Sequence, residues 1–306
     1  MRTISRISVL AATSALALAG CASSGSTEPT PAPSTSESSS AASPSESGAP
    51  ALQTVTEGKL TIATSDPAYE PWVVDNDPSS GKGYESAVAY AVAAELGFAA
   101  EDVEWVAASF DQIIAPGVKN YDFAINQVSI TDERKANIAF SSSYYDATQA
   151  IVTIEGSAAE GVTDIAGLKP LKIGAMVGTT SAAVVEAAVQ PENAISLFND
   201  NDQVKQALAS GLIDAVVFDL PTALYVTAVE LEGGMLIGQL PAGDNPDQFG
   251  LVLDLESPNV EAVTAAVDAM REKGTRVGET QLLLSPARLP SPTTSSRRAR
   301  IPAGDS

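Results

Sequence analysis

The chain has 306 residues, a formal net charge of −21 and no histidine. So acidic a sequence disfavours nucleic-acid binding, because it offers few cations that would displace the counterions of the phosphates. The absence of histidine excludes Ser-His-Asp and Cys-His catalysis and histidine metal sites. We expect neither a cofactor nor a metal ion.

The first twenty residues have the layout of an export signal. Arg2 and Arg6 form a positive start, Ile7 to Ala19 is mostly apolar, and small residues precede Cys21. The apolar stretch is too short for a permanent membrane span. Residues 1–20 therefore predict a signal peptide, and the cysteine after it resembles a bacterial lipobox, which implies acylation of Cys21. The alternative is a buried structural cysteine, although Cys21 precedes any sequence that could fold.

Residues 21–56 are dominated by Ser, Pro, Thr, Ala and Glu. Such a composition buries too little apolar area to offset the entropy lost on ordering, so we expect a disordered tether. A flexible coil of this length has a typical reach of about 30 Å. Cys21 is also the only cysteine, so no disulfide can form within the chain.

From Gly58 to about Leu284, short apolar strands alternate with amphipathic helical stretches, which indicates an α/β fold. The pattern predicts strands at 60–64, 103–106, 123–125, 171–177, 195–198, 214–218 and 249–253. It predicts helices at 86–96, 110–114, 182–189, 204–209, 222–231 and 260–270.

Two segments of the chain echo one another. Lys119–Ile125 leads to Gln127, and Ser210–Val216 leads to Asp219; in each, a polar residue stands five places after an aspartate. Ligands of α/β sheets gather at the carboxyl ends of strands, so the two units could face one ligand. The alternative is that Asp219 only caps the helix that follows it.

Arg134 is the only arginine between Arg6 and Arg271. Its planar guanidinium matches a carboxylate with two parallel hydrogen bonds, which lysine cannot do. The segment Ser129–Arg134 therefore predicts that Arg134 binds a carboxylate. The alternative is a surface ion pair with Asp132 or Glu133.

These motifs together resemble those of the family 3 extracellular solute-binding proteins of polar amino acid ABC importers. The resemblance covers Gly58 to about Thr275 and rests on the order and spacing of Asp66–Trp72, Gly83-Tyr84-Glu85, Asn126–Arg134, Phe140-Ser141, Tyr144-Tyr145, Gly178-Thr179-Thr180 and Gly211–Val216. It implies a type II periplasmic-binding-protein fold of two α/β lobes joined by two hinge strands. Lobe 1 would comprise residues 57–148 and 248–284, and lobe 2 residues 149–247. The hinge strands would lie near 150–152 and 249–251.

The resemblance also implies roles for single residues. Arg134 would grip the ligand α-carboxylate, aided by Thr179 and Thr180 at a helix N-terminus, and Asp219 would take the α-ammonium. Aromatic side chains of the first loop would stack on the ligand, although packing beneath the loop is an alternative for Trp72. The complete expected set of ligand-binding residues is Arg134, Asp219, Thr179, Thr180, Ser129, Gln127, Asn126, Asp66, Tyr69 and Trp72.

Two departures from the family are visible. Ala87 stands where the family often has a second acid after Glu85, and after Thr275 the usual closing amphipathic helix is replaced by a Ser/Pro/Arg-rich segment. We expect residues 285–306 to form a disordered tail, and the loss of the helix to lower stability.

The resemblance implies a monomeric, lipid-anchored substrate-binding protein on the extracellular face of the membrane, with an ABC transporter permease as partner. Its ligand would be a polar amino acid, with a slight preference for a basic one because Asp66 and Glu70 lie near the expected pocket mouth. The alternatives are an amino-acid-sensing receptor subunit and, less favoured, a dehydratase-like enzyme that would rely on carboxylates such as Glu70 or Asp219.

Overall fold

The structure is a computed structural model that describes residues 52–241 and 247–273. The predicted signal peptide 1–20, Cys21, most of the tether 21–56 and the tail 285–306 lie outside the described residues. None of the described helices is long and apolar enough to cross a membrane.

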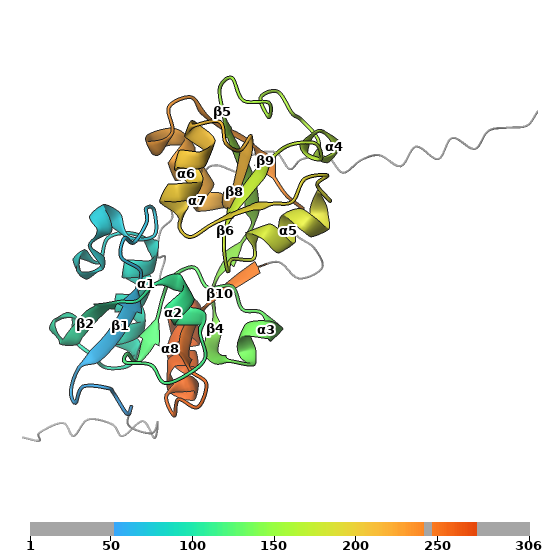
Figure 1. Ribbon diagram of the computed structural model, residues 1–306. Helices are drawn as coiled ribbons and strands as arrows, with labels where there is room; N and C mark the ends of the chain where they lie inside the picture. The colour runs from blue at the N-terminus through green and yellow to red at the C-terminus, as the bar shows by residue number, and fades with distance from the viewer. Residues whose placement is uncertain (1–51, 242–246, 274–306) are drawn as a thin grey trace, which may run out of the picture. The chain divides into compact units, whose positions relative to one another are not determined.

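The first lobe is built on a mixed five-stranded sheet in the order β2-β1-β3-β10-β4 (Figure 1). The central strand β1 pairs in parallel with β2 and β3, whereas β10 pairs antiparallel with β3 and β4. The strands are β1 (Leu60–Thr64), β2 (Val103–Ala107), β3 (Phe123–Ala124), β4 (Ile138–Ala147) and β10 (Asp247–Asp254).

Helices cover this sheet through buried aliphatic side chains. Val88 of α1 and Val263 of α8 pack in one cluster with Ile62 of β1, and all three are fully buried. The helix α2 begins at a capping box, in which Ser109 and Gln112 each accept a hydrogen bond from the other's backbone N–H. The helices of this lobe are α1 (Tyr84–Glu95), α2 (Phe110–Ile114), α3 (Asp132–Lys135) and α8 (Val260–Glu272), with short 3-10 turns at Val74–Asn76, Pro78–Ser80 and Ala100–Asp102.

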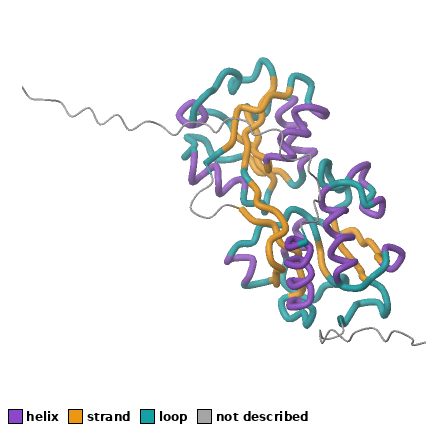
Figure 2. The backbone as a smooth tube through the Cα atoms, turned by 180° about the vertical axis from the view of Figure 1, so that it is seen from behind, coloured by secondary structure: helices purple, strands orange, loops and turns teal. Residues whose placement is uncertain are grey.

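The second lobe repeats this plan with the sheet order β7-β6-β8-β5-β9. Its central strand β6 pairs in parallel with β7 and β8, and β5 pairs antiparallel with β8 and β9. The strands are β5 (Gln149–Ile154), β6 (Ile173–Met176), β7 (Ser196–Phe198), β8 (Ala215–Asp219) and β9 (Gly234–Gln239). Figure 2 shows the strands of both lobes flanked by helices.

Two apolar clusters fill the second lobe. Val185 packs with Ile173 and Val217, and Leu208 packs with Val216 and other side chains in a separate cluster. The helices are α4 (Ile165–Leu168), α5 (Ser181–Ala188), α6 (Asn201–Ala209) and α7 (Leu220–Tyr225), which continues as a π-helical stretch at Val226–Glu230. The mixed sheets and their helices confirm the α/β prediction.

The duplicated sequence motif has the same structural role in both lobes. The Asp122 carboxylate accepts a hydrogen bond from the Thr61 N–H (2.7 Å), and the Asp122 N–H donates to the Thr61 carbonyl (2.8 Å). Asp214 and Lys172 make the same two contacts, both at 2.8 Å. Each aspartate therefore ties its strand, β3 or β8, to the chain at or next to the start of the central strand.

The chain passes from the first sheet to the second at Thr148, between β4 and β5, and returns between β9 and β10. Thr148 and the start of β10 thus lie where the two sheets are joined, and the carboxyl ends of β3 and β8 lead to Gln127 and Asp219.

Candidate ligand-binding site

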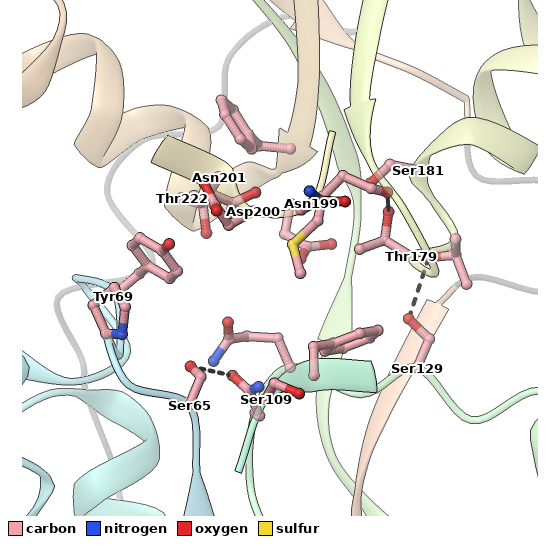
Figure 3. Close-up of a pocket in the computed structure, with 18 of the residues that line it drawn as sticks. Ser65, Tyr69, Ser109, Ser129, Thr179, Ser181, Asn199, Asp200, Asn201 and Thr222 are labelled. Atoms are coloured by element: carbon pink, nitrogen blue, oxygen red, sulfur yellow. Dashed lines mark hydrogen bonds between the residues drawn. The ribbon is translucent and has the colours of Figure 1, made fainter. Parts of the chain in front are cut away.

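A cavity of about 150 Å³ is lined by residues from both lobes. Figure 3 shows Ser65, Ser109 and Ser129 on one side of it and Asn199, Asp200 and Ser181 on the other. Nine of the ten residues expected from the sequence line this cavity: Arg134, Asp219, Thr179, Thr180, Ser129, Gln127, Asn126, Asp66 and Tyr69.

Arg134 is held in the cavity wall by the short helix α3, which begins where the Thr131 hydroxyl accepts the Arg134 N–H. Its side chain is 9% exposed, and its guanidinium donates to the carbonyls of Ser129 (2.7 Å) and Gly178 (2.8 Å). The guanidinium also lies 5.4 Å from the centre of the Phe110 ring. Burial lowers the pKa of Arg134 from its usual value.

The alternative of a surface ion pair does not describe this arginine. Among the described residues Arg134 makes no ion pair, and the neighbouring Asp132 pairs with Lys135 instead (3.3 Å). A buried guanidinium without a paired carboxylate is costly, so its position favours an anionic partner in the cavity.

Asp219 ends β8 and stands at the N-terminus of α7, but its carboxylate makes no capping hydrogen bond. It accepts instead from the Gln149 side-chain amide (2.5 Å). Burial raises the pKa of Asp219 to about 7, and the nearby charge of Asp247 adds to the shift. Asp219 therefore does not cap the helix. Its carboxylate lines the cavity, and a cation there would stabilise the ionised form.

Asp247 was not expected from the sequence. Its carboxylate accepts from the Thr180 hydroxyl (2.7 Å) and from the Gln149 amide (3.3 Å), so it shares Gln149 with Asp219. Thr180 precedes α5 without a side-chain capping bond, and its hydroxyl lies 3.3 Å from that of Ser129. The two crossings between the lobes thus supply partners, Gln149 and Asp247, to residues of the cavity wall.

Gln127 is fixed from behind by Glu85, which is completely buried. Glu85 accepts from the Gln127 N–H (2.7 Å), from the Gln127 side-chain amide and from the Tyr144 hydroxyl. These bonds hold Gln127 at a φ of 47°, a left-handed conformation that is unusual for its residue type. Burial raises the pKa of Glu85 to about 7, although the hydrogen bonds oppose the shift. Next to Gln127, Asn126 accepts from the Ser65 hydroxyl (3.2 Å).

The first loop contributes Asp66 and Tyr69 to the cavity, but Trp72 does not line it. Trp72 is completely buried beneath the loop, so the expected stacking of Trp72 on a ligand is corrected to packing. The Lys205 ammonium lies 5.5 Å from the centre of the Tyr69 ring and pairs with Asp202 and Glu230.

Further lining residues carried no motif that distinguished them in the sequence. Asn199, Asp200 and Asn201 follow the strand β7, so their place after a strand end was the only signal. The other unexpected lining residues are Ser65, Pro67, Ser109, Phe110, Met176, Ser181, Val217, Phe218 and Thr222. Over the described residues, no group of three or more acidic, histidine or cysteine side chains is placed to hold a metal ion.

The sequence model of the bacterial extracellular solute-binding proteins, family 3, matches residues 60–277. The L-arginine-binding protein of Pseudomonas aeruginosa is 28% identical over 188 residues, which are 61% of this chain and 68% of that protein.

Solved structures show the same similarity. An ancestral arginine-binding protein bound to glutamine is 29% identical with a TM-score of 0.62, over 74% of this chain and 99% of that one. An amino acid ABC transporter substrate-binding protein from Streptococcus pneumoniae, bound to L-arginine, is 28% identical with a TM-score of 0.59, over 71% of this chain and 90% of that one.

Proposed function

Because the chain belongs to the bacterial extracellular solute-binding proteins of family 3, we propose that it captures a polar L-amino acid with a basic side chain for an ABC importer. The observation that carries the proposal is a single cavity that holds one buried arginine together with three aspartates. Binding would close the two lobes around the amino acid, as in other hinged binding proteins.

The α-carboxylate would be bound by Arg134. Of its five N–H donors, two donate to carbonyls of described residues, so the guanidinium has capacity for a carboxylate. Ser129 would add a hydroxyl beside it, and Thr180 would do so by exchanging its bond to Asp247 for one to the ligand. The N-terminus of α5 favours negative charge at the same place.

The α-ammonium would be bound by Asp219. Burial and the neighbouring acids raise its pKa, so they disfavour the ionised form of Asp219. An ammonium group beside the carboxylate would stabilise that form. The shared Gln149 amide holds the carboxylate in place from the crossing between the lobes. Burying both ends of a zwitterion against matched charges limits the cost of removing them from water.

The preference for a basic side chain rests on charge balance. Asp66, Asp200 and Asp219 line the cavity against the single cation Arg134. A neutral zwitterion would leave this excess of negative charge uncompensated, whereas a cationic side chain would reduce it. Similarity to arginine-binding relatives supports the same assignment.

A thermal-shift screen of the full chain against the proteinogenic amino acids tests the proposal, because a ligand that binds only the folded state raises the melting temperature with its concentration. We expect L-arginine and L-lysine to give the largest shifts, L-glutamine a smaller one and L-leucine none. The absence of a shift with every amino acid would reject amino acid binding, and a larger shift with L-glutamate than with L-arginine would reject the charge argument.

We also propose that Cys21 is acylated and anchors the protein at the extracellular face of the membrane, where a monomer would deliver its ligand to the permease. More than one acyl chain would suffice for stable anchoring without a transmembrane helix. Cells that express the parent should incorporate labelled palmitate into the protein and retain it in the membrane fraction, whereas Cys21→Ser should lose both. Equal labelling of the variant would reject the anchor. Loss of labelled arginine uptake on deleting the gene would distinguish transport from sensing.

A further inference from the structure

Trp72 makes a hydrogen bond between the two lobes. Its indole N–H, from the first loop of lobe 1, donates to the Thr222 hydroxyl of α7 in lobe 2 over 2.8 Å. Trp72 is completely buried and Thr222 is 6% exposed, so the bond is shielded from water. Thr222 lines the ligand cavity, whereas Trp72 does not.

Aromatic rings fix the indole on the lobe 1 side. The Trp72 ring meets Tyr84, Tyr145 and Phe249 edge to face, with centroid distances of 5.9, 5.3 and 5.6 Å. Tyr145 and Phe249 belong to β4 and β10, the strands that lead to the crossings between the lobes. The position of the indole N–H is therefore set by strands next to the hinge.

The same loop makes a further contact with lobe 2. The Lys205 ammonium lies 5.5 Å from the centre of the Tyr69 ring. Both residues are more exposed than Trp72 and Thr222, so this contact is a weaker candidate for holding the lobes together.

We infer that Trp72 and Thr222 form a latch between the lobes that slows release of the bound amino acid, an inference that rests on the proposed function. A buried N–H is costly without an acceptor, but water can replace Thr222 when the lobes separate. The bond therefore stabilises only the closed form. Its loss should speed opening and leave the encounter of ligand and open form unchanged, so the effect should appear in the dissociation rate.

The test is a double-mutant cycle in the full chain, read by stopped-flow release of L-arginine or of the best ligand in the screen. Thr222→Val leaves the indole N–H without an acceptor, and Trp72→Phe keeps an aromatic ring but removes the donor. Each should raise the dissociation rate about three- to tenfold, the range expected for one buried hydrogen bond. The association rate should stay within about twofold. The double variant should release no faster than the faster single variant, because both changes remove the same bond.

Two controls separate the latch from general destabilisation. Thr222→Ser keeps the hydroxyl and should restore slow release. Trp105→Phe makes the same change at an indole whose N–H bonds Tyr90 within lobe 1 (3.3 Å), and it should leave release unchanged. Multiplicative effects of Trp72→Phe and Thr222→Val in the double variant, or release by Thr222→Val at the parent rate, would overturn the inference.

A measurement without ligand tests the latch separately from the proposed function. Spin labels at Glu101→Cys and Glu192→Cys, exposed positions in lobes 1 and 2, report the distance between the lobes when Cys21 is replaced by serine. Thr222→Val should shift the distances toward longer values, and Thr222→Ser should not. If no amino acid binds the parent, the proposed function fails, and an unchanged distance distribution in Thr222→Val would by itself reject the latch.

Discussion

Binding should be coupled to the loss of a proton from Asp219. In the cavity the pKa of this carboxyl is about 7, because it is buried beside Asp247. An α-ammonium against Asp219 favours the ionised form, so binding must lower this pKa. The chain contains no histidine, which removes the imidazole groups that usually titrate near neutral pH.

The sign and size of the effect follow from that pKa. The carboxyl of the ligand-free protein is about 90% ionised at pH 8 and about 10% ionised at pH 6. Because only the ionised form binds the ammonium well, the dissociation constant at pH 6 should be about tenfold larger than at pH 8. At pH 7, binding should release about half a proton.

Calorimetric titrations at pH 7 in phosphate and in Tris measure the proton directly, since the two buffers differ in ionisation enthalpy. Asp219→Asn should bind more weakly and should lose both the proton release and the pH dependence. Glu85→Gln is the matched control, because it removes the other buried carboxyl whose pKa is about 7 but should keep proton release at Asp219. Buffer-independent heats in the parent, or an affinity that improves toward pH 6, would show that Asp219 does not lose a proton on binding.

Three further outcomes are expected. Burial raises the pKa of Glu85 to about 7, so ionisation of Glu85 lowers the free energy of unfolding as pH rises. Glu85→Gln should reduce the loss of unfolding free energy between pH 5 and pH 8 by up to about 3 kcal/mol in denaturant titrations. The same loss in the parent and the variant would contradict this. Gly83→Ala should lower the melting temperature far more than Gly97→Ala: a Cβ at Gly83 (φ 96°) would lie 2.4 Å from the Trp72 carbonyl, but one at Gly97 (φ 89°) meets nothing within 4 Å, so equal losses would refute the clash. Asp66→Asn with Asp200→Asn should weaken L-arginine binding about tenfold or more and leave L-glutamine within about threefold in competition titrations; equal losses would remove the charge argument.

Much of the fold could be predicted because its signals are local. The helix Phe110–Ile114 was predicted at its observed bounds, and the capping box that begins it joins Ser109 and Gln112, only three positions apart. The repeated Asp122 and Asp214 motifs also carry a local turn and strand pattern. Strands β4 and β9 were not predicted. The serines and tyrosines of β4 do not alternate clearly in polarity, and its pairing with β10 depends on residues about a hundred positions away.

The candidate site also combines residues that could be predicted from the sequence with residues that could not. Arg134 and Asp219 follow predicted strand ends, so their placement in the cavity could be expected from topology. Asp247 could not, because its contacts with Thr180 and Gln149 exist only once the chain has returned from lobe 2 to lobe 1. Trp72 shows a further limit, since sequence reveals an aromatic residue in a loop but not whether its ring faces a ligand or the other lobe.

The role of Arg134 in ligand binding is tested most simply by a calorimetric titration of the parent and of Arg134→Lys with L-arginine. The parent should bind with one site. The variant should bind at least about a hundredfold more weakly, because a lysine ammonium cannot replace two parallel hydrogen bonds to a carboxylate. Lys135→Met, which removes the neighbouring exposed cation, should bind like the parent. Binding by Arg134→Lys with the affinity of the parent would contradict the assignment of the buried guanidinium to the ligand carboxylate.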